Sequence, residues 1–333
     1  MNPRKHPDKR LSLFNDPLQR QRYACSLVMI LLMIGVAEIL QEKEIIFPEM
    51  AALTIGMWIV DKRVWRIKTG QMLLLMTLGA CTAFLFAGIS LLFTRASLFP
   101  MISACVLPVL LKTESWVYPV SVFVMTLIIL VIQRWMEHLG LREKITYEAP
   151  ERHWRADSLR WIYLMITVFA VASLAIYTSN FYFILPPLLV AYVEFVNSRA
   201  GFRNRPVLTV LLLGSGSLVG TLFQLIGYYY LGLSETLVAF FIFIVLFTLF
   251  EWLGKFFAPV GAMALIPMLL PKETLPWLPL QASIGALLFI TMGLVFFQQC
   301  YKWSRARLIY CLIPHYLISR LKRNGKKRND SSV

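Results

Sequence analysis

Long apolar runs alternate with short polar segments along almost the whole chain. The runs lie at about residues 23–40, 46–60, 71–93, 98–111, 117–136, 161–178, 183–197, 207–230, 234–254, 257–270 and 281–299. A helix needs about 20 apolar residues to cross the hydrocarbon core of a bilayer, and most of these runs reach or approach that length. The pattern therefore predicts an all-α, polytopic membrane protein with about ten transmembrane helices.

Basic residues lie in short blocks between the apolar runs. The blocks are the N-terminal head, "DKRVWRIK", the central stretch, "SRAGFRNR" and the C-terminal tail. Lysine and arginine collect in cytoplasmic loops, so we expect these blocks and both termini on the cytoplasmic side of the cell membrane. Run 98–111 then does not cross completely, and it predicts a re-entrant segment or a half-helix.

The composition agrees with a membrane protein. Of the 333 residues, 58% are hydrophobic and 15% are charged, whereas a soluble domain carries about 25% charged residues. In a soluble protein, the net charge of +15 would favour nucleic-acid binding. Because the basic residues border apolar runs here, we expect membrane lipids and no nucleic acid as partners. Assembly into a homo-oligomer is an open alternative.

The same pattern divides the chain into consecutive regions. They are a basic cytoplasmic segment (1–22), a first membrane repeat (23–136), a cytoplasmic linker (137–160), a second membrane repeat (161–300) and a basic cytoplasmic tail (301–333). Within the tail, "LIYCLIPHYLI" is too short to span a bilayer. We expect either an interfacial helix or a helix packed on the cytoplasmic face of the protein.

The division into repeats rests on two similar proline-bearing segments, "LFPMISACVLPVLL" and "FAPVGAMALIPMLLP". When Pro100 is aligned with Pro259, Pro108 falls on Pro267, and both copies read P-x7-P-x-L-L. An interior proline removes a backbone donor and breaks or kinks a helix. The repeats are unequal, because the second has room for two spans (207–254) where the first has one.

Paired broken helices are typical of transporters, which place their site between two repeats near the bilayer midplane. Positive helix ends and free N–H groups at such a break can hold an anion. Glu194 and Asn197 add polar groups within an apolar run, although Glu194 could instead pair with Arg199 or Arg203 at the interface. The predicted binding residues are Pro100, Ser103, Pro108, Glu194, Asn197, Pro259, Gly261 and Pro267.

The second half resembles the HPP family of bacterial and plastid membrane proteins, which is named for a His-Pro-Pro motif. "FAPVGAM" keeps Pro259, Gly261 and Ala262, but it has Phe257 where the histidine would fall and Ala258 for the first proline. Some HPP members are described as nitrite transporters. "AALTIGMWIVDKRVWRIKTGQMLLLMTLG" is similar to the membrane part of fusaric-acid-resistance-type aromatic acid exporters. Both resemblances imply transport of small anions.

Enzymatic patterns are weak in this sequence. The four histidines (His6, His138, His153 and His315) lie outside the apolar runs, and neither they nor the cysteines have metal-site spacing. We therefore expect no catalytic residue, no cofactor and no metal. The sequence favours a secondary transporter of a small anion, such as nitrite or an organic acid. The alternatives are a non-transporting membrane scaffold or partner subunit and, third, a membrane enzyme acting on a lipid-linked substrate.

Overall fold

The computed structural model describes residues 16–60, 71–73, 75–76, 100–111, 116–142, 154–197 and 205–304. All of the regular elements in these ranges are helices. Six helical segments are long and apolar enough to cross a membrane, which makes the chain a multi-pass helical membrane protein. They are α2 (Pro17–Leu40), α7 (Val117–His138), α8 (Trp154–Tyr177), α10 (Pro206–Phe223) with its π-helical continuation η5 (Gln224–Tyr230), α11 (Glu235–Leu253) and α13 (Leu278–Cys300), which follows η6 (Lys272–Trp277).

The remaining helices are short. They are η1 (Lys43–Ile45), α3 (Glu49–Thr54) with its π-helical continuation η2 (Ile55–Ile59), α6 (Pro100–Leu111), η3 (Phe181–Ile184), α9 (Pro186–Asn197) and α12 (Ala258–Leu269). A helix of 12 residues such as α12 is about 18 Å long, well short of the hydrocarbon core of about 30 Å. The expected count of about ten spans is therefore not established, and most of run 71–93 lies outside the described residues.

Several helices begin where proline or a capping side chain allows it. Pro17, Pro206 and Pro259 occupy the first turn of α2, α10 and α12, where the missing N–H has no intrahelical acceptor to lose. Asp16 caps α2 by accepting a hydrogen bond from the Leu18 N–H at 3.0 Å. This cap places the start of α2 before Tyr23, the start expected from hydropathy, because polar residues extend the helix beyond its apolar part.

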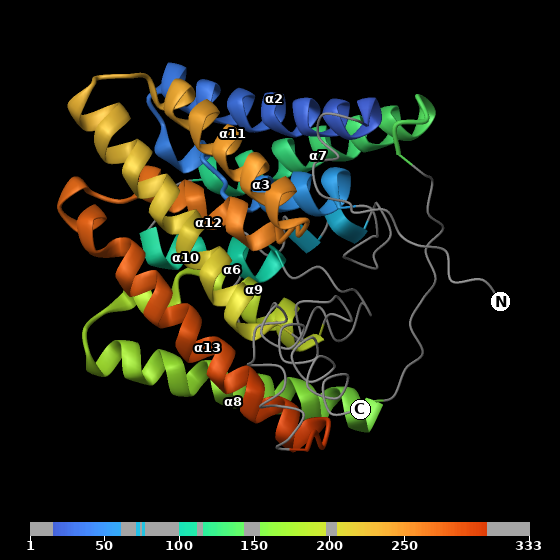
Figure 1. Ribbon diagram of the computed structural model, residues 1–333, viewed down its shortest axis with the longest axis vertical. Coiled ribbons are helices and arrows are strands. Elements are labelled where there is room, and N and C mark those ends of the chain that lie inside the picture. Colours follow the sequence, from blue (N-terminus) through green and yellow to red (C-terminus); the bar gives the residue numbers. More distant parts are fainter. Residues whose placement is uncertain are drawn as a thin grey trace, which may run out of the picture.

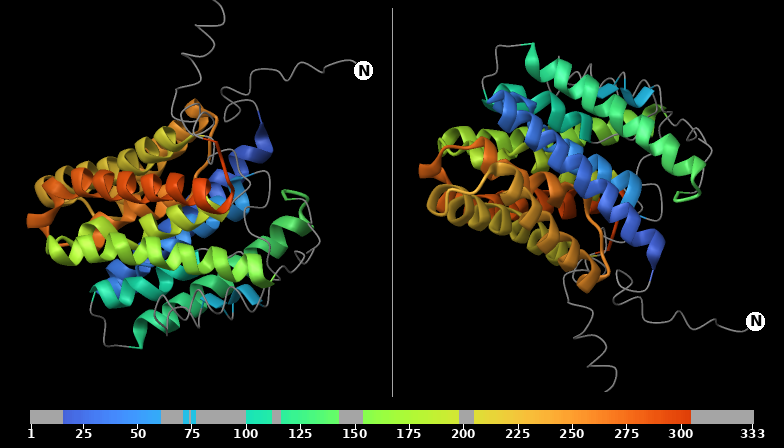
Figure 2. Two further views of the ribbon diagram at one scale, coloured as in Figure 1. Left: turned by 90° about the horizontal axis from the view of Figure 1, so that it is seen from below. Right: turned by 90° about the horizontal axis from the view of Figure 1, so that it is seen from above.

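The long helices surround the short ones (Figure 1). α2 and α7 lie on one side, α8 and α13 lie on the opposite side, and α3, α6, α9 and α12 lie between them. Two further views show several of the long helices running along roughly the same direction (Figure 2). We call the end of the bundle at Asp16 the inner end and the end at Gln41 the outer end.

Packing between the short helices crosses from one half of the chain to the other. α12, from the second half, packs on α3 from the first, and α6, from the first half, packs on α9 from the second. α12 also packs on α9, whereas α6 and α12 share no extensive contact. Nearly every residue of α9 and α12 is buried. α8, in contrast, exposes large apolar side chains such as Ile166 and Phe169, as expected of a lipid-facing helix.

Candidate functional site

Each of the four short helices α3, α6, α9 and α12 has a proline at its start, either just before the helix or in its first turn. Pro48 precedes α3, Pro100 begins α6, Pro186 begins α9, and Pro259 is in the first turn of α12. The structure therefore places the predicted prolines on two central short helices, α6 and α12. It does not lay the two proline-bearing helices against each other, because each packs on a short helix of the opposite half.

A buried carboxyl group lies where α3 and α6 meet. Glu49, in the first turn of α3, is 1% exposed. Its Oε1 accepts a hydrogen bond from the hydroxyl of Ser103, which is fully buried on α6. The other oxygen, Oε2, is buried and has no hydrogen-bond partner among the described residues. Ser103, one of the predicted site residues, is therefore the partner of a carboxyl group that the sequence reasoning did not select.

Tyr118, at the start of α7, lies beside this pair. It interacts electrostatically with Glu49 and Cys105, and its hydroxyl donates to the Ala104 carbonyl at 3.4 Å. Ala104 stands four residues before Pro108, and an interior proline leaves the carbonyl at that position without its usual intrahelical donor. The expected break is not observed, because α6 continues through Pro108 to Leu111 and α12 continues through Pro267 to Leu269. The tyrosine partly satisfies the one carbonyl that Pro108 leaves without a donor.

The second predicted carboxyl group, Glu194, lies in the last turns of α9. It is 4% exposed, and its Oε2 is buried without a hydrogen-bond partner in the described part of the chain. Asn197 is the last residue of α9, and its side-chain amide donates to the Val193 carbonyl at 3.0 Å. The alternative partners, Arg199 and Arg203, lie outside the described residues. Nothing among the described contacts joins Glu194 or Asn197 to Glu49.

The predicted residues of α12 have packing roles. Gly261 lies against Ile55 and Ala51 of the first half, and an added Cβ would overlap the end of the Ile55 side chain. Pro259 and Pro267 are both buried. On its other side α12 meets α10, where Gly216 and Gly220 lie against its backbone. Glycines at such positions let two helices approach closely, so this surface of α12 is a tight interface.

Helix starts offer fewer backbone donors than the sequence suggested. α9 begins with Pro186 and Pro187, neither of which has an N–H, and the Leu188 N–H donates to the Leu185 carbonyl at 2.9 Å. In α12 the Val260 N–H donates to the Phe257 carbonyl at 3.1 Å. The starts of α9 and α12 therefore present fewer free N–H groups than a helix start usually provides.

α10 carries a row of buried polar groups beside this centre. Ser217, Thr221 and Gln224 follow one another at helical spacing, and each is at most 2% exposed. The hydroxyl groups of Ser217 and Thr221 have no hydrogen-bond partner among the described residues, and the Gln224 amide lies near the Glu235 carboxyl group. Gln224 opens the π-helical segment η5, and such segments are frequent at functional sites. Buried polar groups without partners are uncommon in folded proteins and mark places where water or a ligand can bind.

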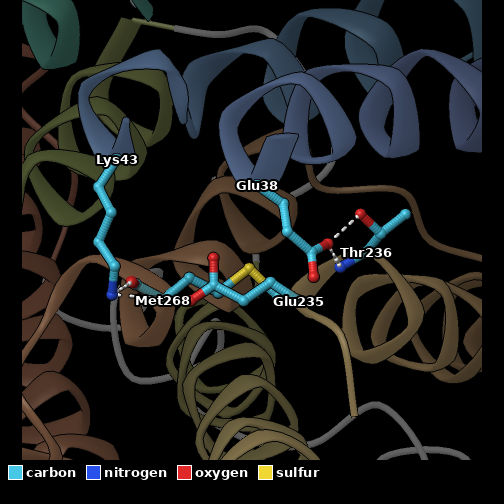
Figure 3. A network of polar contacts seen from close by, with 5 residues as sticks. All are labelled: Glu38, Lys43, Glu235, Thr236 and Met268. Carbon is cyan, nitrogen blue, oxygen red and sulfur yellow. Dashed lines mark hydrogen bonds and ion pairs between the residues drawn. The ribbon is translucent and has the colours of Figure 1, made fainter. Parts of the chain in front are cut away.

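A polar network joins the two halves at the outer end (Figure 3). Glu38 of α2 accepts hydrogen bonds from the N–H and hydroxyl groups of Thr236, at 3.1 and 2.7 Å, in the first turn of α11. Lys43 lies 3.6 Å from Glu235 Oε1 and donates to the Met268 carbonyl at 3.4 Å. An anion at a helix start and a cation at a helix end both complement the helix dipole.

At the inner end, α2 is joined to α11 as well. The Tyr23 hydroxyl donates to Glu251 Oε1 at 2.6 Å, and both side chains are buried. Side chains also satisfy the last carbonyls of η2, since the Gln19 amide donates to Ile59 at 3.4 Å and Arg142 donates to Trp58 at 3.5 Å. α2 and α11 are therefore held together by polar contacts near both of their ends.

Sequence reasoning missed Glu49 because it stands in "QEKEIIFPEM", next to residues that read as a polar outer loop. The available signal was the Pro-Glu pair at the start of an apolar run, which is typical of a helix N-terminus. The described residues contain no group of three or more histidine, cysteine, aspartate or glutamate side chains that could hold a metal ion. Comparison with models of protein families, with curated proteins and with solved structures gave no match for this chain.

Proposed function

We propose that this chain is a secondary transporter of a small anion, nitrite or an organic acid, and that the anion binds where the four short helices meet. The observation that carries the proposal is the crossed packing of α12 on α3 and of α6 on α9. Half-length helices of this kind mark the substrate site in transporters built from two halves. The resemblance of "FAPVGAM" to the HPP motif supports the same substrate class.

The proposal includes two unequal tandem repeats, residues 23–136 and 161–300. Their short helices follow in the same order, with α3 and α6 in the first half matching α9 and α12 in the second. Because each proline-bearing helix rests on the opposite half, a small rotation of one half against the other moves both contacts together. In this proposal the inner end faces the cytoplasm, as the basic blocks suggest.

The binding chemistry rests on the polar groups between α3 and α6. Glu49 and Ser103 supply a carboxyl group and a hydroxyl group in surroundings that are otherwise mostly apolar. A buried anion needs hydrogen-bond donors, because its transfer from water into an apolar environment is otherwise very costly. Ser103 is the side-chain donor of α6 that meets Glu49 at this junction, so we assign it to the anion. The proposal assigns no catalytic residue and no cofactor.

Uptake into proteoliposomes tests this function. Purified protein is reconstituted, and entry of nitrite and of short carboxylic acids is measured against protein-free vesicles. Ser103→Ala is expected to lower the apparent affinity about tenfold, which corresponds to the loss of about 1.4 kcal/mol. Glu273→Gln, an exposed carboxyl change on η6, is the matched control and should leave uptake unchanged.

Two results would contradict the proposal. Folded protein that transports none of these anions would favour the scaffold reading, which predicts co-purification with a partner instead. Uptake that is identical in the wild type and in Ser103→Ala would remove the junction of α3 and α6 as the binding site.

A further inference from the structure

In the part of the chain that the structure describes, the groups packed around the carboxyl group of Glu49 are uncharged. Of the elements that pack on α3, helices α12 and η2 contain no titratable residue. α6 contributes Cys105, and α7 contributes Tyr118. α2 contributes Ser26, which bonds Thr54, and Met33, whose sulfur contacts the Phe47 N–H.

No lysine, arginine or histidine among the described residues forms an ion pair with Glu49. An ionised carboxylate in an apolar environment costs far more free energy than its protonated form unless a cation compensates it. Its place in the first turn of α3 favours the ionised form through the helix dipole, but that contribution is at most about 2 kcal/mol. Burial outweighs it, so Glu49 is better suited to hold a proton than to remain charged.

The hydrogen bond to Ser103 links this proton to the anion. When Glu49 is ionised, its Oε1 accepts the hydrogen bond of the Ser103 hydroxyl. When Glu49 is protonated, its own O–H can donate to the Ser103 oxygen, and the serine hydrogen is then free to point elsewhere. Protonation of Glu49 thus releases the hydroxyl that the proposed function assigns to the anion.

We propose that Glu49 carries a proton that crosses the membrane together with the anion, so that the chain is a proton–anion symporter. This inference rests on the proposed function. The proton binds to a carboxylate oxygen of Glu49 from the side of entry and leaves from the same oxygen on the other side, and no covalent bond of the anion changes. One proton accompanies one monovalent anion, so the loaded site gains no net charge. After proton and anion have left, the Glu49 carboxylate accepts the hydrogen bond of the Ser103 hydroxyl until the next proton binds.

Glu194 provides the comparison within the same protein. It is also buried, and one of its oxygens also lacks a partner. However, no described hydroxyl group bonds to it, and it lies at the far end of α9 from the proline-led start. The exchange of a hydrogen bond between acid and hydroxyl, which couples proton and anion at Glu49, therefore has no described counterpart at Glu194.

The test uses proteoliposomes with an imposed pH gradient and labelled nitrite as the probe. In the wild type, an acidic outside should accelerate nitrite accumulation, and the external medium should become more alkaline as protons enter. Glu49→Gln mimics the protonated acid, so it should keep exchange of external for internal nitrite while accumulation driven by the pH gradient falls about tenfold or more. Glu273→Gln, the exposed carboxyl change on η6, is the matched control and should keep gradient-driven accumulation.

Infrared difference spectroscopy gives a second readout that needs no transport. Full-length protein in detergent should show the carbonyl stretch of a protonated carboxyl group at neutral pH, and one component of this band should be lost in Glu49→Gln but not in Glu273→Gln. Nitrite exchange that does not respond to the pH gradient would overturn the symport inference and leave the transporter proposal intact. If nitrite and short carboxylates do not enter at all, both proposals fall. If no component is lost in Glu49→Gln, protonation of Glu49 is disproved.

Discussion

The helices α6 and α12 share the same spacing of prolines but have different surroundings. Three residues after its first proline, α6 carries Ser103, which bonds a buried carboxyl group. The residue at the same spacing in α12 is Ala262, which is buried and has no polar side-chain atom. Next to it, Gly261 lets Ile55 approach closely. A short proline-bearing helix in a membrane is therefore not in itself a polar site, because its own side chains and those of its neighbours decide whether polar groups meet there.

The largest loss of stability is expected from a substitution at the contact between α12 and α10. Gly220 lies against the backbone of Ala264, which cannot move aside as a side chain would. Overfilling a packed interface typically costs about 1–3 kcal/mol and sometimes more, so Gly220→Leu should reach the upper end and prevent accumulation of folded protein. Leu218→Phe, on the exposed side of the same helix, is the control. Size-exclusion chromatography of detergent-solubilised protein after heating measures both, and a stable Gly220→Leu protein would disprove tight packing here.

The buried carboxyl group of Glu49 beside α6 is expected to lower the stability of the fold, although transport depends on it. Glu49→Met replaces a buried carboxyl group by an apolar side chain of similar length, which removes a desolvation cost of about 1–3 kcal/mol. We expect a higher melting temperature in detergent together with loss of gradient-driven nitrite uptake. The reference is Glu49→Gln, which keeps a polar group at the position. A lower melting temperature for Glu49→Met would mean that the carboxyl group supports the fold.

A smaller change in stability is expected at the proline inside α6. Tyr118→Phe removes the donor to the Ala104 carbonyl, which Pro108 leaves without its helical partner. The loss should be about 1 kcal/mol, the usual contribution of one hydrogen bond. In Pro108→Ala the helix can satisfy that carbonyl itself, so the same tyrosine change should cost less. Urea or thermal denaturation of the four proteins in this cycle tests the coupling, and strictly additive effects would contradict it.

The smallest change in stability is expected in the polar network that joins the two halves at the outer end. The side chain of Lys43 is 55% exposed, although its partner Glu235 is buried. Ion pairs with an exposed member contribute about 0–1 kcal/mol and are weakened by salt, so Lys43→Met should lower stability only slightly, and less at high ionic strength. Thr236→Val, which removes a hydroxyl that bonds Glu38 across the two halves, should cost more. Thermal shifts at low and high salt compare the two changes, and a larger loss for Lys43→Met would reverse this order.

Predictions from sequence were most successful where a property depends on neighbours along the chain. Proline positions indicated short helices, and hydropathy indicated an all-helical membrane protein, because both depend on the local backbone and on local solvation. Sequence reasoning selected Ser103 in a repeated motif, but it did not select Glu49, the partner of Ser103, which is distant in sequence and next to the polar residues of "QEKE". Gly261 was selected as a site residue for the same motif, although its observed contact is packing against Ile55.

The sequence by itself determined the class of protein and the places where helices begin, because hydrophobic length and proline geometry act within a few residues. Only the tertiary structure decided that α12 packs on α3 and α6 on α9, and that one carboxyl group meets a serine between them. The physical reason is that helices of nearly uniform hydrophobicity have little sequence preference for one partner over another. Close packing and the pairing of the few buried polar groups select the arrangement.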